Sequence, residues 1–269
     1  MNTWHSIIKY AAIALAVLII IGVISGIMFV LSHFVPGFTN NAVGEDKTYE
    51  IKDEISVLDI DIHAINLEVR TTTDSTIRVE SNYKYLTVTE KDNRLLIKDK
   101  KAFFLNYQGK AIIRLYIPDD KVFDTIEINT GAGKADLKNL QTKFIYMNFG
   151  AGKVDLRNIS ARVNASLETG AGQLTIRNST FNNLNLNMGV GQFEFSGKLT
   201  GRNILKMGVG SSQIDLSGSL DDYTVKIEKG IGEIRVNNKK VQSDTQLGQG
   251  DIELFFEGGV GSAWINFSE

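Results

Sequence analysis

The sequence contains, at residues 126–137, the stretch IEINTGAGKADL, and variants of this stretch recur through the second half of the chain. At its centre is the signature Gly-X-Gly, which occurs eight times, with first glycines at residues 131, 150, 170, 189, 208, 230, 248 and 259. The signatures follow one another at about twenty residues, and only the last interval is much shorter. Such a period predicts a solenoid, in which each repeat buries its apolar face only against its neighbours.

Apolar and polar residues alternate on both sides of each signature. In the first repeat Ile128 precedes the glycines, and Ala135 and Leu137 follow them with Asp136 between. A period of two is typical of strands that bury one side. Each repeat is therefore predicted to contain a strand, a glycine corner, a second strand and a turn. The predicted fold is an all-β solenoid of rungs of about 20 residues with Gly-X-Gly corners, preceded by one transmembrane helix.

The glycines are predicted to form corners because tight bends need positive φ or close backbone approach. The predicted structural corners are Gly131, Gly133, Gly150, Gly152, Gly170, Gly172, Gly189, Gly191, Gly208, Gly210, Gly230 and Gly232. The small or aliphatic residue within each signature is expected to point inward. The repeat at Gly208 needs a two-residue insertion, Ser211-Ser212, to align its apolar residues with the other repeats. The opposite corners carry residues that tolerate a left-handed conformation, namely Asn139, Asn158, Asn178, Gly197, Gly218 and Asn238.

A long apolar segment lies near the amino terminus. Residues 11–32 contain no charged side chain, and about twenty apolar residues suffice to cross a bilayer as a helix. We therefore predict a transmembrane helix over residues 7–32. A cleaved signal peptide is the alternative, but its apolar region is normally shorter and ends in small residues, whereas this run continues through Phe29-Val30-Leu31 toward Pro36. An uncleaved signal anchor fits better.

The charges around this segment indicate its orientation. Lys9 precedes the uncharged run, and no lysine or arginine follows it until Lys47. The positive-inside tendency places residues 1–6 in the cytoplasm. We predict a linker over residues 33–50 and an extracytoplasmic β-solenoid domain over residues 51–269, which makes this a single-pass protein of the cell membrane.

Composition excludes several function classes. The formal net charge of −2 does not favour nucleic-acid binding. Phosphate loops place their glycines between a strand and a helix, and no helical pattern follows these signatures. The chain has no cysteine, and its only histidines are His5, His33 and His63, which excludes thiolate nucleophiles and histidine triads from the repeats. Acidic positions become Thr175 and Arg235 in other repeats, which argues against calcium ladders. We expect no metal and no cofactor.

The polar residues between the apolar positions are the candidate functional residues. Solenoid enzymes that act on polysaccharides use acids on an exposed strand face, and four acids could line one here: Asp136, Asp155, Glu194 and Asp215. They lie among lysines and arginines, as on an ordinary solvated sheet, and we predict no catalytic residue. Lys138, Arg157 and Arg177 each follow a first glycine by seven residues. They form the candidate ligand face for an anion, the alternative being solubility and edge protection.

Two aromatic groups stand out. Residues 103–107, FFLNY, form an apolar loop that could contact the bilayer or a membrane partner, or fill the core. Four aromatic residues lie in the last two repeats: Phe255, Phe256, Trp264 and Phe267. Because the spacing shortens there, we predict that they form a terminal cap over the last core layer, with docking of another protein as the alternative.

The run Leu115-Tyr116-Ile117-Pro118, followed by residues 126–133 and the repeated Gly-Ala-Gly and Gly-Val-Gly signatures, resembles the bacterial putative adhesin domain, a domain of unknown function, over residues 55–269. One span followed by this domain is also similar to LiaG-type membrane-anchored proteins, which accompany cell-envelope stress systems in Gram-positive bacteria. The resemblance implies a β-solenoid outside the membrane. It supplies no catalytic residues.

The sequence therefore predicts a membrane-anchored extracytoplasmic scaffold or binding module at the bacterial cell envelope, related to adhesion or envelope stress, and not an enzyme. Its expected partners are the cell membrane, through the amino-terminal helix, and an unknown envelope protein or glycan. Two alternatives are a carbohydrate-active enzyme on a β-solenoid and an accessory subunit of a membrane signalling complex.

Overall fold

The computed structural model describes residues 43–268, except residues 53, 65 and 100–110. Within this part, most residues lie in β-strands, and the one helix is the three-residue 3-10 turn η1 (Leu220–Asp222). The prediction of an all-β fold is therefore confirmed. None of the helical structure in the described ranges is long and apolar enough to span a bilayer. The predicted span, residues 7–32, and the aromatic loop 103–107 lie outside those ranges.

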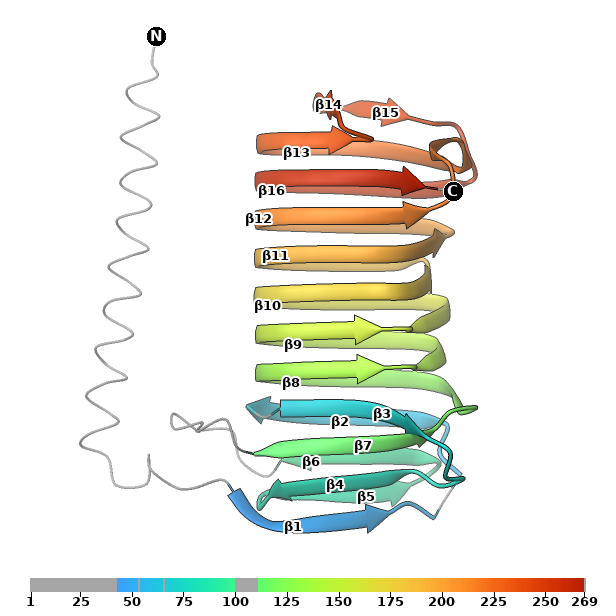
Figure 1. Ribbon diagram of the computed structural model, residues 1–269, viewed down its shortest axis with the longest axis vertical. Helices are drawn as coiled ribbons and strands as arrows, with labels where there is room; N and C mark the ends of the chain where they lie inside the picture. Colours follow the sequence, from blue (N-terminus) through green and yellow to red (C-terminus); the bar gives the residue numbers. More distant parts are fainter. Residues whose placement is uncertain (1–42, 53, 65, 100–110, 269) are drawn as a thin grey trace, which may run out of the picture. The chain divides into compact units, whose positions relative to one another are not determined.

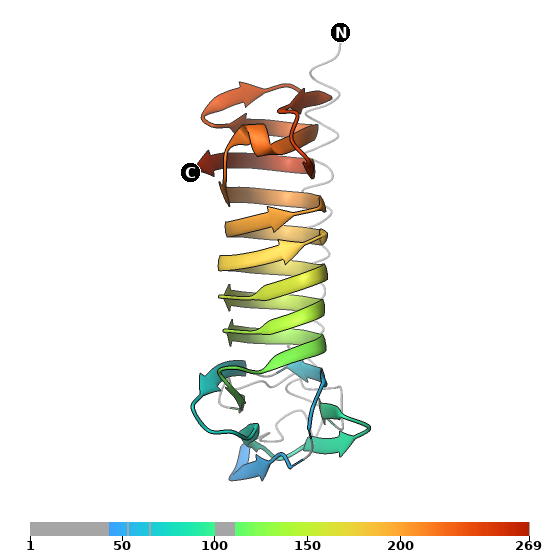
Figure 2. The ribbon, with the colours of Figure 1, turned by 90° about the vertical axis from the view of Figure 1, so that its right-hand side faces the viewer.

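Seven long strands stack side by side and make up most of the fold (Figure 1). Each strand bends at a Gly-X-Gly signature, so that its two halves lie in different layers (Figure 2). Stacked neighbours run parallel and pair residue for residue on both sides of the bend. In stacking order the strands are β8 (Val122–Lys138), β9 (Gln141–Arg157), β10 (Ser160–Asn182), β11 (Leu184–Thr200), β12 (Arg202–Ser217), β16 (Ile252–Ser268) and β13 (Tyr223–Val236).

Apolar side chains from both layers fill the space between them. In β8, Ile128 from the first half and Leu137 from the second half are fully buried. The pairing register aligns one such residue from every long strand, each of them buried: Ile128, Met147, Leu167, Leu186, Leu205, Phe256 and Ile227. The core is thus a continuous column, in which each rung is covered by the rungs above and below it.

The backbone at the bends leaves no room for a side chain. Gly210 has φ +145°, and a Cβ there would overlap the carbonyl oxygen of Gly191 in the neighbouring strand. Gly208, whose φ is not positive, would likewise place a Cβ against the carbonyl oxygen of Gly189. Close approach between rungs therefore demands glycine at both positions of the signature, and positive φ demands it again at the second.

The opposite corners adopt the predicted conformation. Asn139, Asn158 and Asn178 have φ of 56°, 55° and 51°, and Asn238, Gly197 and Gly218 also have positive φ. The Asn158 side-chain amide donates to the Asn139 side-chain oxygen at 2.8 Å, and the Asn139 amide donates to the Thr71 hydroxyl at 2.9 Å. The prediction of left-handed corners is confirmed at all six positions, and the asparagines also link successive rungs.

The residues inside the signatures lie on the outside of the bends, although they were predicted to point inward. Val190, Val209, Val260 and Ile231 are 53%, 46%, 47% and 52% exposed, and Ala132, Ala151 and Ala171 are also exposed. They pair in register and form a ridge along the outside of the bends. The bend, at which the second glycine has positive φ, leaves the intervening side chain on the outside, so the prediction was wrong.

The repeat at Gly208 contains no insertion. Ser212 pairs with Phe193 on one side and with Ala263 on the other, and it is only 3% exposed. A small hydroxyl side chain therefore occupies the core position that Phe193 fills in the next rung. The predicted two-residue insertion was wrong because it assumed that every core position is apolar.

The last strand does not continue the stack in chain order. β16 lies between β12 and β13 and is parallel to both. The signature at Gly248 forms no rung. Gly248 and Gly250 lie in the connection that leads to β16, where they pack against the backbone of η1 and Tyr223. The prediction of a terminal cap was therefore wrong: Phe256 is buried within the stack, and Trp264 is 39% exposed on its outside.

Two shorter antiparallel strands cover the far edge of β13 instead. They are β14 (Lys239–Val241) and β15 (Thr245–Leu247). Covering an edge in this way removes a row of backbone groups that could otherwise pair with another chain.

Interrupted rungs form the amino-terminal end. β2 (Val57–Ala64) pairs with the first half of β8, and β3 (Asn66–Thr72) pairs with its second half. β6 (Arg94–Asp99) pairs with β2, and β7 (Ile112–Pro118) pairs with β3. Antiparallel pairs complete this end: β5 (Leu86–Lys91) pairs with β6, β4 (Arg78–Tyr83) pairs with β7, and β1 (Val43–Glu50) pairs with β4. Residues 43–50, which the sequence assigned to the linker, are thus a paired strand.

The substitution Gly210→Ala tests the constraint at the bends. We expect a loss of about 3 kcal/mol or more in unfolding free energy, because left-handed strain adds to overpacking against Gly191. The neighbouring Val209→Ala is the matched control, with an expected cost below about 1 kcal/mol, because Val209 is half exposed. Urea denaturation followed by circular dichroism measures both, and equal costs would contradict the account.

Candidate functional site

The second halves of the stacked strands carry two rows of outward side chains. Residues five positions after the first glycine form one row, and residues seven positions after it form the other. The first row is Asp136, Asp155, Thr175, Glu194, Gln213, Trp264 and Arg235. The second row includes Lys138, Arg157, Arg177, Ser196, Asp215 and Asn266. We call these two rows, with Arg70 from β3, the polar face.

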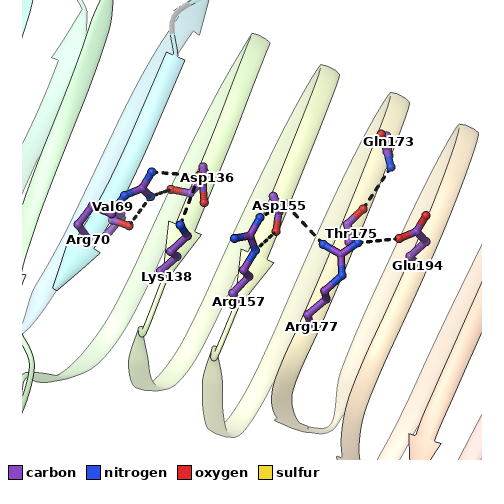
Figure 3. A network of polar contacts seen from close by, with 10 residues as sticks. All are labelled: Val69, Arg70, Asp136, Lys138, Asp155, Arg157, Gln173, Thr175, Arg177 and Glu194. Carbon is purple, nitrogen blue, oxygen red and sulfur yellow. Dashed lines mark hydrogen bonds and ion pairs between the residues drawn. The ribbon is translucent and has the colours of Figure 1, made fainter.

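Acids and bases on the lower half of the polar face contact one another in a ladder (Figure 3). Arg70 donates to Asp136 at 3.0 Å, and Lys138 lies 3.8 Å from the same carboxylate. Arg157 donates to both oxygens of Asp155, at 2.8 and 2.6 Å. Charged side chains thus link β3 to β8, and on β9 they form a separate pair.

The ladder continues through Arg177 to β11. Its guanidinium lies 3.7 Å from the Asp155 carboxylate and donates to Glu194 at 3.0 Å. Asp155 and Thr175 are almost fully buried although they lie in the outward rows, because Arg157, Arg177 and Gln173 contact them from neighbouring positions.

A groove of about 300 Å³ opens above the ladder. It is lined by side chains of β10, β11 and β12, namely Arg177, Glu194, Ser196, Gln213 and Asp215, with Ile176 and Phe195 beneath them. The pairing of β10 with β11 shifts between Ile176 and Ser179, so that Arg177 and Asn178 both oppose Ser196. This bulge and the short serine side chain leave the space open.

The acids of the groove accept hydrogen bonds from fixed donors. Asp215 accepts one from the Gln213 amide at 3.2 Å and one from the Asn266 amide at 2.8 Å. Glu194 accepts one from Arg177 at 3.0 Å. The groove therefore presents carboxylate, amide and guanidinium groups in orientations that their hydrogen bonds hold, together with the Ser196 hydroxyl.

A family model described as Toastrack DUF4097 matches residues 55–268, which is most of the chain. The chain belongs to the Toastrack DUF4097 family. No curated protein matches this Toastrack chain significantly.

Solved structures similar to this Toastrack chain come from several bacteria. One is described as a putative cell adhesion protein from Clostridium sporogenes; it is 15% identical, with coverage of 83% of this chain and 99% of that chain and a TM-score of 0.33. A second, a putative adhesin from Bacteroides fragilis, is 14% identical, with coverage of 84% and 98% and a TM-score of 0.33. A third, described as a putative lipid binding protein from Parabacteroides distasonis, is 13% identical, with coverage of 82% and 97% and a TM-score of 0.32.

The Toastrack fold brings the three predicted ligand-face residues onto adjacent strands. Lys138, Arg157 and Arg177 lie on β8, β9 and β10, and each has an acid within 4 Å. Their charges are therefore balanced within the face, which reduces the attraction that this row would otherwise exert on an anion. Recognition of an anionic ligand by this row stays a prediction.

Sequence reasoning missed Trp264 as a surface residue. Its position, five residues after Gly259, is the outward position that acids and amides occupy in other rungs. That offset was the available signal. Trp264 pairs in register with Gln213 of β12 and Arg235 of β13, so it lies one strand beyond the groove.

Metal binding finds no support in the described part of this Toastrack chain, where no group of three or more His, Asp or Glu side chains could hold an ion. His63, the one histidine there, lies with its Nδ1 at 2.6 Å from the Asp99 carboxylate.

The contact between Arg157 and Asp155 predicts a pH-dependent contribution to stability. Hydrogen bonding from Arg157 holds the pKa of Asp155 below its usual value, and the charges of Arg157, Arg177 and Lys153 act in the same direction. A carboxyl group whose pKa is lower when folded stabilises the protein above its unfolded pKa of about 4. That contribution disappears as the pH falls through the lower, folded pKa.

Asp155→Asn should therefore destabilise the protein at pH 7, and its difference from the parent should shrink as the pH falls below about 4. The matched control is Glu253→Gln, because the Arg202–Glu253 pair is well exposed at 3.5 Å and should contribute little. Urea denaturation at a series of pH values measures both variants. A difference for Asp155→Asn that is independent of pH would contradict this assignment.

Proposed function

We propose that this chain is a membrane-anchored, extracytoplasmic binding module that holds a component of the bacterial cell envelope, and that it is not an enzyme. The uncharged run 11–32 supports the anchor, since its length suits a membrane-spanning helix. Lys9 before it, and the absence of lysine and arginine after it until Lys47, support an external position for the domain.

The observation that carries the binding role is the interlocked polar face. Its charged side chains contact one another from strand to strand, as in the series Arg157–Asp155–Arg177–Glu194. Groups whose rotamers are fixed by neighbours lose little freedom when a ligand binds. A stack with a continuous core and such a face suits the display of a preformed binding surface.

A carbohydrate-active enzyme is the second candidate, because Glu194 and Asp215 line the same groove. Glycoside hydrolysis needs one carboxyl group to deliver a proton to the leaving oxygen. Here both carboxylates accept hydrogen bonds from Arg177, Gln213 and Asn266, which favours binding over hydrolysis. Release of new reducing ends from an oligosaccharide, lost in both Glu194→Gln and Asp215→Asn, would instead favour the enzyme.

Cysteine labelling tests the proposed location cleanly, because the chain has no cysteine. In spheroplasts of a bacterial host, Lys239→Cys, at an exposed position, should react with a membrane-impermeant maleimide. Asn2→Cys, on the other side of the predicted span, should react only after lysis. Deletion of residues 7–32 should also release the protein from the membrane fraction.

Labelling of Lys239→Cys only after lysis would contradict an extracytoplasmic domain. Retention of the deletion variant in the membrane fraction would contradict anchoring by the predicted span.

A further inference from the structure

We propose that the groove beside Ser196, together with Trp264, is a binding site for a neutral saccharide. This proposal deepens the proposed function, on which it rests, by assigning a ligand class to one part of the polar face.

The shape of the site follows from the bulge in β10. Arg177 and Asn178 oppose the single residue Ser196, and Asp215 lies opposite Ser196 on the other side. The resulting space of about 300 Å³ is at the lower end of the range that small-molecule sites occupy. On the rungs below, the same row carries the longer side chains Lys138 and Arg157.

The polar groups suit hydroxyls, which both donate and accept. Asp215 and Glu194 use part of their acceptor capacity on Gln213, Asn266 and Arg177. A carboxylate offers about four lone-pair sites, so each retains capacity for a ligand hydroxyl. The Ser196 hydroxyl and the remaining N–H groups of Arg177 supply donors. Because the protein contacts fix the acids in place, a polyol meets an ordered array.

Trp264 supplies a flat apolar surface next to these groups. Its side chain is 39% exposed, although so large an aromatic ring is usually more deeply buried. Its register partner Gln213 lies at the groove, and Gln213 also donates to Asp215. The C–H face of a sugar ring packs on such an indole, while its hydroxyls reach polar groups beside it. An aromatic surface beside hydroxyl-binding acids is the combination that a saccharide requires.

Charge selects neutral ligands over anionic ones. The groove contains two carboxylates, Glu194 and Asp215, and one guanidinium, Arg177, which already contacts Glu194. An excess of one acid repels phosphate-rich or uronate-rich polymers. A neutral oligosaccharide meets no such repulsion.

Tryptophan fluorescence tests the site directly, because the chain has only two tryptophans, Trp4 and Trp264. In the full-length Trp4→Phe chain, held in a zwitterionic detergent without sugar headgroups, all tryptophan emission comes from Trp264. We expect chitotetraose or cellotetraose to change this emission saturably, with a shift to shorter wavelength as the ring is covered. Polygalacturonate, an anionic polymer, should cause no change.

Variants locate the binding by calorimetry. Trp264→Ala and Ser196→Arg, which fills the groove, should each weaken binding at least about tenfold, the effect of losing about 1.4 kcal/mol. Asp215→Asn is a third variant, which removes the charge of the carboxylate and preserves the volume of the side chain. Tyr146→Ala is the control, because Tyr146 is a similarly exposed aromatic residue, at 43%, in the other layer. Thermal melting verifies that each variant is folded.

Failure of both neutral oligosaccharides to alter Trp264 emission up to millimolar concentration would overturn the proposal. Equal affinity in Trp264→Ala, Ser196→Arg and Tyr146→Ala would also overturn it, because binding would then lie elsewhere. These outcomes are distinct from failure of the proposed function, which the labelling of Lys239→Cys decides. If a chain that is labelled only after lysis still bound the saccharide, the site would be supported and the proposed location refuted.

Discussion

Neighbouring backbones meet at the Gly-X-Gly bends, where the carbonyl oxygen of one glycine occupies the space that a Cβ would need in the next strand. At Gly210 this oxygen belongs to Gly191, and at Gly261 it belongs to Gly210. Because no side chain fits, the bends stack directly over one another, and every residue at a fixed offset from a bend lines up with its equivalents. This alignment produces both the buried column through Ile128 and Met147 and the outward rows of the polar face.

The polar face shows how one alignment yields two kinds of surface. Where the two rows carry long acids and bases, as at Asp155 and Arg157, the side chains contact one another and fill the surface. Where a short residue such as Ser196 enters a row, the same alignment leaves a groove with fixed polar walls. A single short residue in the repeated frame therefore opens a groove without change to the fold.

Much of the fold could be predicted, because the spacing of glycines and the alternation of apolar residues report directly on bends and buried faces. The left-handed Asn139 and Asn158 were predictable for the same local reason. The strand order was not, because the long strands have equivalent edges, and nothing in their pattern places β16 between β12 and β13. The outward Val209 depended on the φ of the flanking glycines, and the buried Ser212 depended on space within the core.

The candidate site was predicted only in part. Offsets from the glycines placed Lys138, Arg157 and Arg177 on one face, but their contacts with acids depend on side-chain conformation. The groove depends on the bulge at Arg177 and Asn178, which no periodicity reveals. Trp264 lies beside Gln213 only because β16 enters the stack between β12 and β13.

Register at the bends therefore supports the whole account, and disulfide cross-linking measures it most directly. Ser211 of β12 pairs with Ser262 of β16, and Glu233 of β13 lies one strand farther on. In this cysteine-free chain, Ser211→Cys with Ser262→Cys should form an intramolecular disulfide on mild oxidation, because adjacent strands bring the two Cα atoms within bonding range. Ser211→Cys with Glu233→Cys should stay reduced. The reverse pattern would place β13 next to β12 and contradict the inserted strand, the register and the position of Trp264 beside the groove.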